Sequence, residues 1–277
     1  MSDANPLVRE LHVYPLKSAG GIQVERTAVD MRGLDHDRRW MLVDAEGMFI
    51  SQREHARMAL LNMRPADGGF VAEAPGMSPL FIASEPPTSG RRMVQVWSSR
   101  LRAWIYPPAV DEWFSQFLGL QCHLTAMPED GKRVANPRNT RSLTPIRFVD
   151  GYPILLLSDA SLADLNSRLA QPLPHDRFRA NIIISGCEAY AEDGWDRFSI
   201  GDVEFETIKP CPRCVVTTID QRSAQKSDEP LRTLAAYRNR GGAVEFGMYA
   251  RALNAGTINR GAQILFKLRR SAADGQI

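Results

Sequence analysis

The sequence predicts a mainly β protein with some α. Most segments with a clear pattern are short runs rich in β-branched and aromatic residues, separated by Gly, Asp and Pro. Only two segments have the apolar spacing of an amphipathic helix. The chain has 277 residues, 44% of them hydrophobic, so it can bury a large core in one big domain or two packed ones. A closed barrel is a natural arrangement for so many short strands.

The first part of the chain is predicted to consist of β-hairpins. Strand-like runs are separated by turn residues such as Gly20-Gly21 and by a loop with consecutive prolines at 86–87. The strands predicted here cover residues 11–14, 27–30, 39–43 and 93–97.

A helix and a long loop are expected to follow. Residues 110–118 place Trp113, Phe114 and Phe117 at helical spacing, and Gly119 follows where helices often end. Residues 128–145 are polar and rich in Arg and Asn, so we expect a loop. Long loops inside compact domains are commonly functional.

The second part begins with an apolar strand that leads directly into a helix. Residues 153–157 form the strand, and Ser158 is predicted to cap a helix whose apolar side carries leucines at 162, 165 and 169. Further strands are predicted at residues 178–186, 203–208, 244–249 and 263–268.

Composition narrows the classes of partner. The net charge is only +2, so wholesale coating of a nucleic-acid polymer is not expected, although a local basic pocket remains open. The N-terminus has no secretory pattern, and no apolar run approaches the length of a membrane span. Four cysteines do not make a disulfide framework for so long a chain, and Cys122 and Cys187 are expected to be small buried hydrophobes. We therefore expect a protein of the reducing cytoplasm without a membrane partner.

The most informative motif is Lys-Pro-Cys-Pro-Arg-Cys at residues 209–214, followed by a β-branched run at 215–219 that reads as a strand. Positive charge from Arg213 and Lys209 is expected to favour the thiolate of Cys214. A structural zinc site needs about four ligands, and a thioredoxin-type pair needs a helix after its first cysteine. A third alternative is a single thiolate that binds a transition metal. All three alternatives remain open at this point.

Basic and small polar residues lie at the ends of several predicted elements. Lys17, Ser18, Arg38 and Arg179 would form an anion site if they converged with the predicted helix start at Asp159. The five histidines, at positions 12, 36, 55, 123 and 175, show no metal-ligand spacing, and the sequence contains no Gly-rich phosphate loop.

Four motifs together resemble the MOSC proteins, a family named after the C-terminal domain of molybdenum cofactor sulfurase. They lie at residues 13–18, 157–166, 178–187 and 209–220. Within the family, the chain looks like the mitochondrial amidoxime-reducing component and its bacterial relatives. The resemblance implies a MOSC β-barrel packed with an N-terminal β-barrel-like domain, over residues 123–277 and 1–122 respectively.

The resemblance also implies a molybdenum-molybdopterin cofactor. It makes Cys214 the molybdenum ligand and Asp159 a second candidate for a catalytic role, as a positioning or proton-relay group. Ala160 stands where some relatives have a threonine. Together with the charged Arg213, the implied cofactor contacts are Lys17, Ser18, Arg38, Asp159, Ala160, Ser161, Arg179 and Asn181.

The activity implied by the resemblance is reduction of N-hydroxylated compounds: hydroxylamines, amidoximes and N-hydroxylated bases. No cysteine follows Cys214 that could bind an iron-sulfur cluster. Electrons are therefore expected from a separate donor protein of the ferredoxin, flavoprotein or cytochrome b5 type. The alternative is a non-catalytic carrier of the molybdenum cofactor or a sulfur-transfer module.

Overall fold

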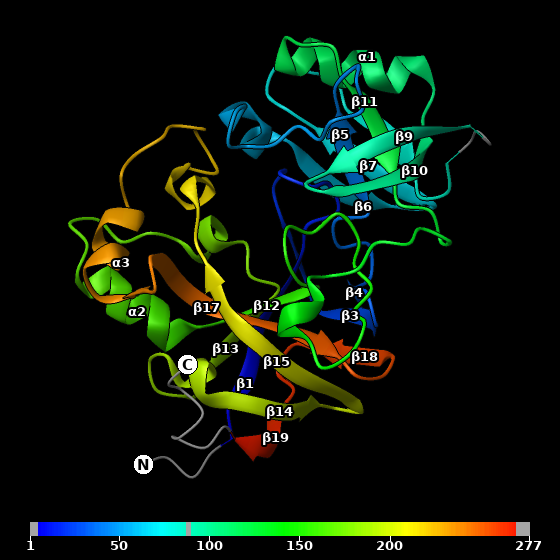
Figure 1. Cartoon of the computed structure of the whole chain (residues 1–277). Coiled ribbons are helices and arrows are strands. Elements are labelled where there is room, and N and C mark those ends of the chain that lie inside the picture. The colour runs from blue at the N-terminus through cyan, green and yellow to red at the C-terminus, as the bar shows by residue number, and fades with distance from the viewer. Residues whose placement is uncertain (1–4, 87–89, 270–277) are drawn as a thin grey trace.

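The fold is mainly β, which confirms the predicted class (Figure 1). The computed structural model describes residues 5–86 and 90–269. Within these residues the strands form four sheets, and three α-helices accompany them. No helix in these ranges combines the length and the apolar character needed to cross a membrane.

The largest sheet has nine strands, eight of them in the order β19-β14-β15-β17-β12-β13-β1-β2 and the ninth, β16, paired with β17. The pair β12 and β13 is parallel, whereas the other pairs are antiparallel. The strands are β1 (Leu7–Val13), β2 (Ile22–Val24), β12 (Ile154–Ser158), β13 (Ile182–Ser185), β14 (Trp195–Ile200), β15 (Val203–Pro212), β16 (Asn239–Arg240), β17 (Ala243–Ala252) and β19 (Ile264–Arg269).

A second group of strands forms the upper part of the molecule in Figure 1. One sheet has the order β5-β11-β10-β9, and a smaller meander has the order β6-β7-β8. Helix α1 (Pro108–Leu118) packs its buried Val110, Phe114 and Phe117 against this part. The strands are β5 (Trp40–Val43), β6 (Asn62–Ala66), β7 (Gly69–Glu73), β8 (Leu80–Ala83), β9 (Arg91–Val96), β10 (Ser99–Ile105) and β11 (His123–Ala126).

The N-terminal segment is hydrogen-bonded to the second part of the chain. β1 pairs with β13, and β3 (Arg26–Asp30) lies between β4 (Gly33–Leu34) and β18 (Gly256–Asn259). The two parts are therefore joined by backbone pairing between residues far apart in the sequence. The division into 1–122 and 123–277 stays a prediction.

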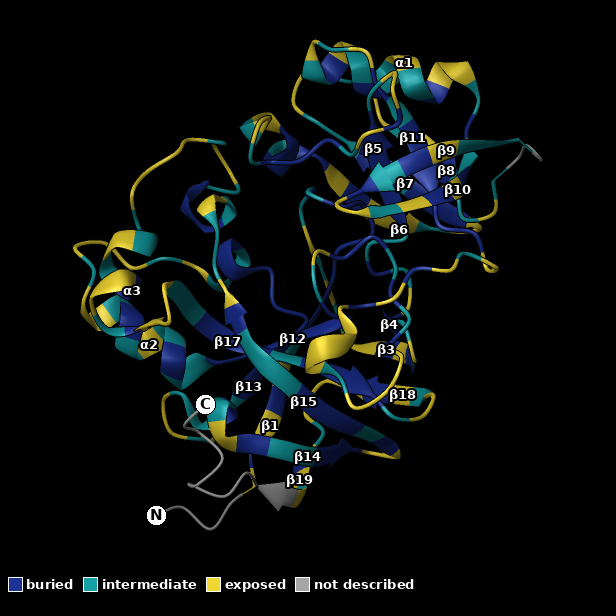
Figure 2. Ribbon diagram, in the orientation of Figure 1, coloured by how far each residue is buried: buried dark blue, intermediate teal, exposed yellow. Residues whose placement is uncertain are grey.

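Separate hydrophobic clusters stabilise the two parts. One cluster packs against the large sheet around Leu156, Phe198 and Phe205, and another fills the upper part around Trp40 and Phe114. A third cluster fixes α2 (Asp159–Ser167) and α3 (Leu231–Tyr237) beside the large sheet. Figure 2 shows exposed residues on the outer sides of α1 and α3, while the central strands are largely buried.

The local signals for two helices are confirmed. α1 ends at Gly119, whose φ of 71° lies in the left-handed region that glycine adopts without steric cost. Ser158 caps α2, and its side chain accepts a hydrogen bond from the Ser161 backbone N–H.

Two strand predictions need correction. Residues 215–219 were predicted as a strand, but Val215–Thr218 form a 3-10 helix, η5. The hydroxyl of Thr217 donates to the Cys214 carbonyl at 2.9 Å, and Thr218 makes the same bond to Val215 at 2.8 Å, so local hydrogen bonds override β propensity. The strand predicted at 178–186 is shorter, because His175–Phe178 form η3 and only Ile182–Ser185 are extended.

Other elements had no clear sequence signal. The remaining 3-10 helices are η1 (Ala56–Leu60), η2 (Pro137–Asn139) and η4 (Ala191–Gly194), and η2 lies inside the predicted loop at 128–145. The prediction of a buried thiol is confirmed for Cys122 and wrong for Cys187, which is only half-buried.

Candidate functional site

A pocket of about 380 Å³ is lined by residues from both parts of the molecule. The upper part contributes Arg53 and Trp97, and the large sheet with its loops contributes Asp150, Tyr152 and Tyr249. Of the site residues predicted from the sequence, those that line this pocket are Lys17, Ser18, Arg38, Arg179, Asn181, Arg213 and Cys214. The fold therefore brings together segments that are widely separated in the sequence.

Cys214 lies between the end of β15 and the start of η5, where the chain turns at the pocket wall. Its side chain is only partly buried. The guanidinium of Arg53 lies beside it, with Nη2 3.8 Å from the Cys214 Sγ. A cation next to a sulfur that faces a pocket suits a thiolate ligand.

Arg213 contacts the other cysteine of the pair. Its Nη1 lies 2.9 Å from Cys211 Sγ, and its Nη2 donates to the Phe178 carbonyl at 2.7 Å. Arg213 interacts electrostatically with Cys214, as the sequence predicts, but its hydrogen-bonding contact is with Cys211. Because adjacent residues at the end of a strand point to different sides, the guanidinium reaches back to residue 211, and Arg53 makes the contact with Cys214.

Lys17 is a buried cation at the pocket. It is 4% exposed, donates to the Phe148 carbonyl at 2.9 Å and forms an ion pair with Asp150. Burial lowers the pKa of Lys17 to about 8, against the opposing effect of the Asp150 carboxylate. Burial alone would raise the pKa of Asp150, but the charges of Lys17 and Arg53 outweigh it and lower that pKa. The ammonium of Lys17 therefore loses its proton more readily than that of an ordinary exposed lysine.

Two arginines lie over the ring of buried Tyr14. The Cζ of Arg38 is 4.2 Å and the Cζ of Arg179 is 4.5 Å from the ring centroid. Arg38 is also held by Asp37, with Nη1–carboxylate distances of 2.8 and 2.7 Å, and its Nη2 donates to the Arg179 carbonyl. Asn181 donates to Asp37 and so completes a buried network around the Arg38 guanidinium, whereas Nη1 of Arg179 donates to the Ala19 carbonyl.

Several residues that line the pocket adopt left-handed backbone conformations. Outside glycine, the described residues with positive φ include Ser18 at 65°, Arg38 at 47°, Trp97 at 54° and Arg179 at 56°. Such conformations cost energy for residues with a Cβ and concentrate at functional sites. The strain here coincides with three of the predicted cofactor contacts.

The chemistry of the lining fits an anionic group carrying a soft metal. Among the described residues that line the pocket, Asp150 is the one acidic residue. Six are cationic: Lys17, Arg38, Arg53, Arg179, Lys209 and Arg213. Arg179 Nη2 and Arg213 Nε are buried and have no hydrogen-bond partner. Unpaired buried donors are costly, so they favour an acceptor in the pocket, such as a phosphate. Cys214 provides the sulfur that soft transition metals select.

The three site residues predicted at the start of α2 are not among the described residues that line this pocket. Asp159 Oδ2 pairs with Arg9 Nη1 at 2.9 Å, and the Ser161 hydroxyl donates to the buried Glu192 at 2.9 Å. Ala160 lies between them in the first turn. The roles of Asp159, Ala160 and Ser161 stay predictions.

Sequence reasoning missed several lining residues. Arg53 follows the buried Ser51 and Gln52 in a segment without periodicity, and Trp97 resembled an ordinary strand residue. Asp150 precedes Gly151 just before β12, a pattern typical of a turn. The position of Asp150 after a long polar loop and before a buried strand was the one usable signal.

The fold and the site together describe a protein of two β-rich parts with a basic pocket that carries a thiol. Sequence models of two domains match these two parts. The sequence model of the MOSC N-terminal beta barrel domain matches residues 5–121, and that of the MOSC domain matches residues 144–265. The chain belongs to the MOSC domain family.

More particular relatives agree with this assignment. The chain is 34% identical to mitochondrial amidoxime-reducing component 1 of Homo sapiens, over 92% of this chain and 81% of the relative. Identity is also 34% to mitochondrial amidoxime reducing component 2 of Rattus norvegicus, over 83% of this chain and 72% of the relative. Molybdenum cofactor sulfurase of Homo sapiens is 30% identical over 88% of this chain, which spans only 30% of that protein.

Proposed function

We propose that the protein is a molybdenum cofactor-dependent reductase of N-hydroxylated compounds. The observation that carries this proposal is the position of Cys214: a partly buried thiol in a pocket lined by six cations. The names of its relatives, the amidoxime-reducing components, supply the substrate class. The substrates would be hydroxylamines, amidoximes or N-hydroxylated bases.

In this proposal, residues of the pocket hold a molybdenum-molybdopterin cofactor. Cys214 would be the protein ligand of the metal, and the phosphate would lie among Lys17, Arg38, Arg179 and Arg213. The buried donors Arg179 Nη2 and Arg213 Nε support this role, because each needs an acceptor. When bound, the cofactor supplies two-electron reduction that removes oxygen from nitrogen.

The chain's own contribution would be positioning, charge and proton supply. Reduction of a hydroxylamine to an amine and water consumes two electrons and two protons. Lys17 Nζ holds a proton that it can release near neutral pH, since its pKa is about 8. Its partner Asp150 is 46% exposed and links Lys17 to solvent. The electrons would come from a separate donor protein of the ferredoxin, flavoprotein or cytochrome b5 type.

The second candidate is a cofactor carrier or sulfur-transfer module. It is favoured by the contact of Arg213 with Cys211, since a cation 2.9 Å from a second sulfur suits a thiolate that could carry a persulfide. The similarity to a molybdenum cofactor sulfurase agrees with this candidate. The two candidates differ in turnover of an N-hydroxylated substrate.

The test uses protein from a host that makes molybdenum cofactor. Molybdenum is measured by mass spectrometry, pterin by fluorescence after oxidation, and benzamidoxime reduction with a chemical electron donor. We expect near-stoichiometric molybdenum, turnover in the wild type, and loss of both in Cys214→Ser. Cys187→Ser is the matched control, since Cys187 does not line the pocket. Cofactor without turnover would favour the carrier. A well-folded wild type without molybdenum would contradict the reductase and the cofactor carrier and would favour the sulfur-transfer module.

A further inference from the structure

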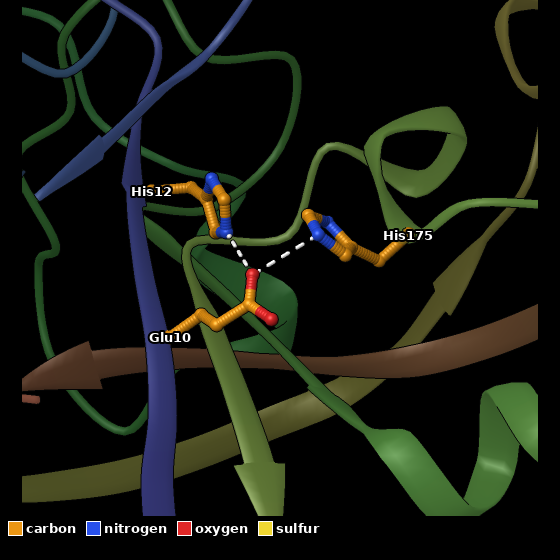
Figure 3. A group of neighbouring side chains, drawn as sticks. All are labelled: Glu10, His12 and His175. Carbon is orange, nitrogen blue, oxygen red and sulfur yellow. Dashed lines mark hydrogen bonds and ion pairs between the residues drawn. The ribbon is translucent and has the colours of Figure 1, made fainter. Parts of the chain in front are cut away.

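A second group of chemically reactive side chains lies outside the Cys214 pocket. Glu10 and His12 on β1 face His175 at the start of η3 (Figure 3). Glu10 Oε2 is 2.9 Å from His12 Nε2 and 3.0 Å from His175 Nε2. One nitrogen or oxygen from each residue lies within 4.8 Å of those of the other two. Two imidazoles thus converge on one carboxylate oxygen.

The fold explains why this group forms without a sequence motif. Residues two apart on a strand point to the same face, so Glu10 and His12 project together from β1. His175 comes from the other part of the chain, in the turn that precedes β13. Because β13 pairs with β1, this turn is brought against the same face. Spacing along the sequence could not reveal the group.

Hydrogen bonding within the group leaves buried polar atoms unsatisfied. His175 Nδ1 and Asp176 Oδ1 are buried without a hydrogen-bond partner, although most buried polar atoms in proteins have one. An imidazole that binds a metal through Nε2 carries its proton on Nδ1 and usually donates it to a carboxylate or carbonyl. Asp176 places an unpaired acceptor in the same turn as His175.

The surroundings of His12 and Glu10 favour the protonation states that metal ligands need. Burial lowers the pKa of His12, which favours the neutral imidazole. For Glu10, burial acts to raise the pKa, but the hydrogen bond with His12 and the charges of His175 and Arg9 lower it. Neutral imidazoles with an ionised carboxylate are the forms that bind metal ions.

The group also has an open side. His12 and His175 line a cavity of about 590 Å³, together with Tyr14, Asp176, Gln221 and Arg222. A metal held by three protein ligands at this wall would keep at least one position for water or another ligand. A closed structural site has no such opening.

We propose that Glu10, His12 and His175 form a site for a divalent first-row transition ion, with Zn²⁺ as its expected occupant. Two imidazoles and one carboxylate are a ligand set that zinc accepts with water in the fourth position. Tetrahedral bonds of about 2.1 Å place ligand atoms about 3.4 Å apart. The separations of 2.9 and 3.0 Å from Glu10 Oε2 need to widen slightly to admit the ion, and the ligand nitrogens of the two imidazoles lie within 4.8 Å of each other.

The test is a calorimetric titration of the chelator-treated full chain with Zn²⁺ at neutral pH. We expect one ion per chain in the wild type, with affinity at least about tenfold lower in Glu10→Gln and in His175→Ala. His55→Ala is the matched control, because His55 is exposed and outside the group. Co²⁺ serves as a second probe, since its absorption distinguishes nitrogen and oxygen ligands from thiolate.

Each outcome decides the proposal. Retained one-to-one affinity in both variants, or absence of zinc binding in the wild type, would overturn it. A thiolate-to-cobalt absorption band as the only signal would assign the ion to a cysteine and overturn it equally. Circular dichroism and the unfolding midpoint, measured with chelator, identify a variant that fails to fold. Glu10→Gln preserves size and keeps the test decisive if His175→Ala does not fold.

Discussion

The guanidinium of Arg53 lies 3.8 Å from the sulfur of Cys214, although the two residues belong to different parts of the molecule. Arg53 is held in place by Asp150, 3.0 Å from its Nη2, and by the ring of Trp97, whose centroid is 4.7 Å from its Cζ. The guanidinium in contact with the candidate metal ligand therefore comes from the upper part, and Arg213 of the cysteine motif adds an electrostatic interaction with Cys214.

This contact predicts that Arg53 contributes to cofactor retention. Loss of a charged contact of this kind costs roughly 1.5–3 kcal/mol, so we expect Arg53→Ala to retain molybdenum about tenfold less tightly than wild type. Arg53→Lys keeps the charge and should recover part of the loss. Arg57→Ala is the control, because exposed Arg57 lies over the Phe117 ring away from the pocket. Metal content after dialysis measures the effect, and equal retention in Arg53→Ala and Arg57→Ala would contradict it.

Buried Lys17 predicts an alkaline gain in stability. Its pKa falls from 10.5 in the unfolded chain to about 8 in the folded protein, mainly because burial penalises the charge. Between these values the unfolded state binds more protons, so the free energy of unfolding rises with pH through this window. The gain from this group is up to about 3 kcal/mol.

Chemical denaturation at pH 8 and at pH 10.5 measures this gain. We expect the increase in Lys17→Met to be smaller than in wild type, while Lys132→Met, which changes an exposed lysine, keeps it. Other groups titrate in the same range, so the difference between the two variants is the quantity that matters. An identical increase in both variants would show that Lys17 is not the group responsible.

Local sequence signals were sufficient to predict the start of α2, the end of α1 and one residue of the site, Cys214. Ser158 caps α2 and Gly119 ends α1 because each conformation depends on atoms within a few residues. Cys214 was recognisable because its motif is contiguous. The β-branched run after Cys214 wrongly predicted a strand, because the hydroxyls of Thr217 and Thr218 each donate to the backbone carbonyl three residues earlier.

The site residues that the sequence did not predict are brought together by contacts between segments far apart in the chain. Arg53 and Asp150 meet only because the upper part packs against the loop before β12. His12 and His175 meet only because β1 enters the sheet beside β13. No periodicity along the chain encodes contacts of this kind, so charge and spacing pointed to a basic pocket without supplying its complete lining.

The ring of Tyr14 is predicted to support two arginines at once. Removing it in Tyr14→Leu should destabilise the protein by about 2–4 kcal/mol, because both guanidinium groups lose an aromatic face in a buried site. Tyr14→Phe keeps the ring and loses only the hydroxyl's bond to the Ala180 carbonyl, which costs about 1 kcal/mol. Denaturant unfolding of both variants tests this, and equal losses would exclude a role for the ring.

The start of α2 provides a prediction that separates cofactor binding from surface pairing. Asp159 forms an ion pair with Arg9 at 2.9 Å, and Arg9 is largely exposed. If Asp159 contacts the cofactor, Asp159→Asn lowers pterin content, whereas Arg9→Gln breaks the same ion pair and leaves pterin content unchanged. We expect this asymmetry, measured by pterin fluorescence on protein loaded in a molybdenum cofactor-producing host.

A surface pair of this type contributes at most about 1 kcal/mol, so neither change should unfold the chain. Equal pterin content in the two variants and wild type would remove Asp159 from the site.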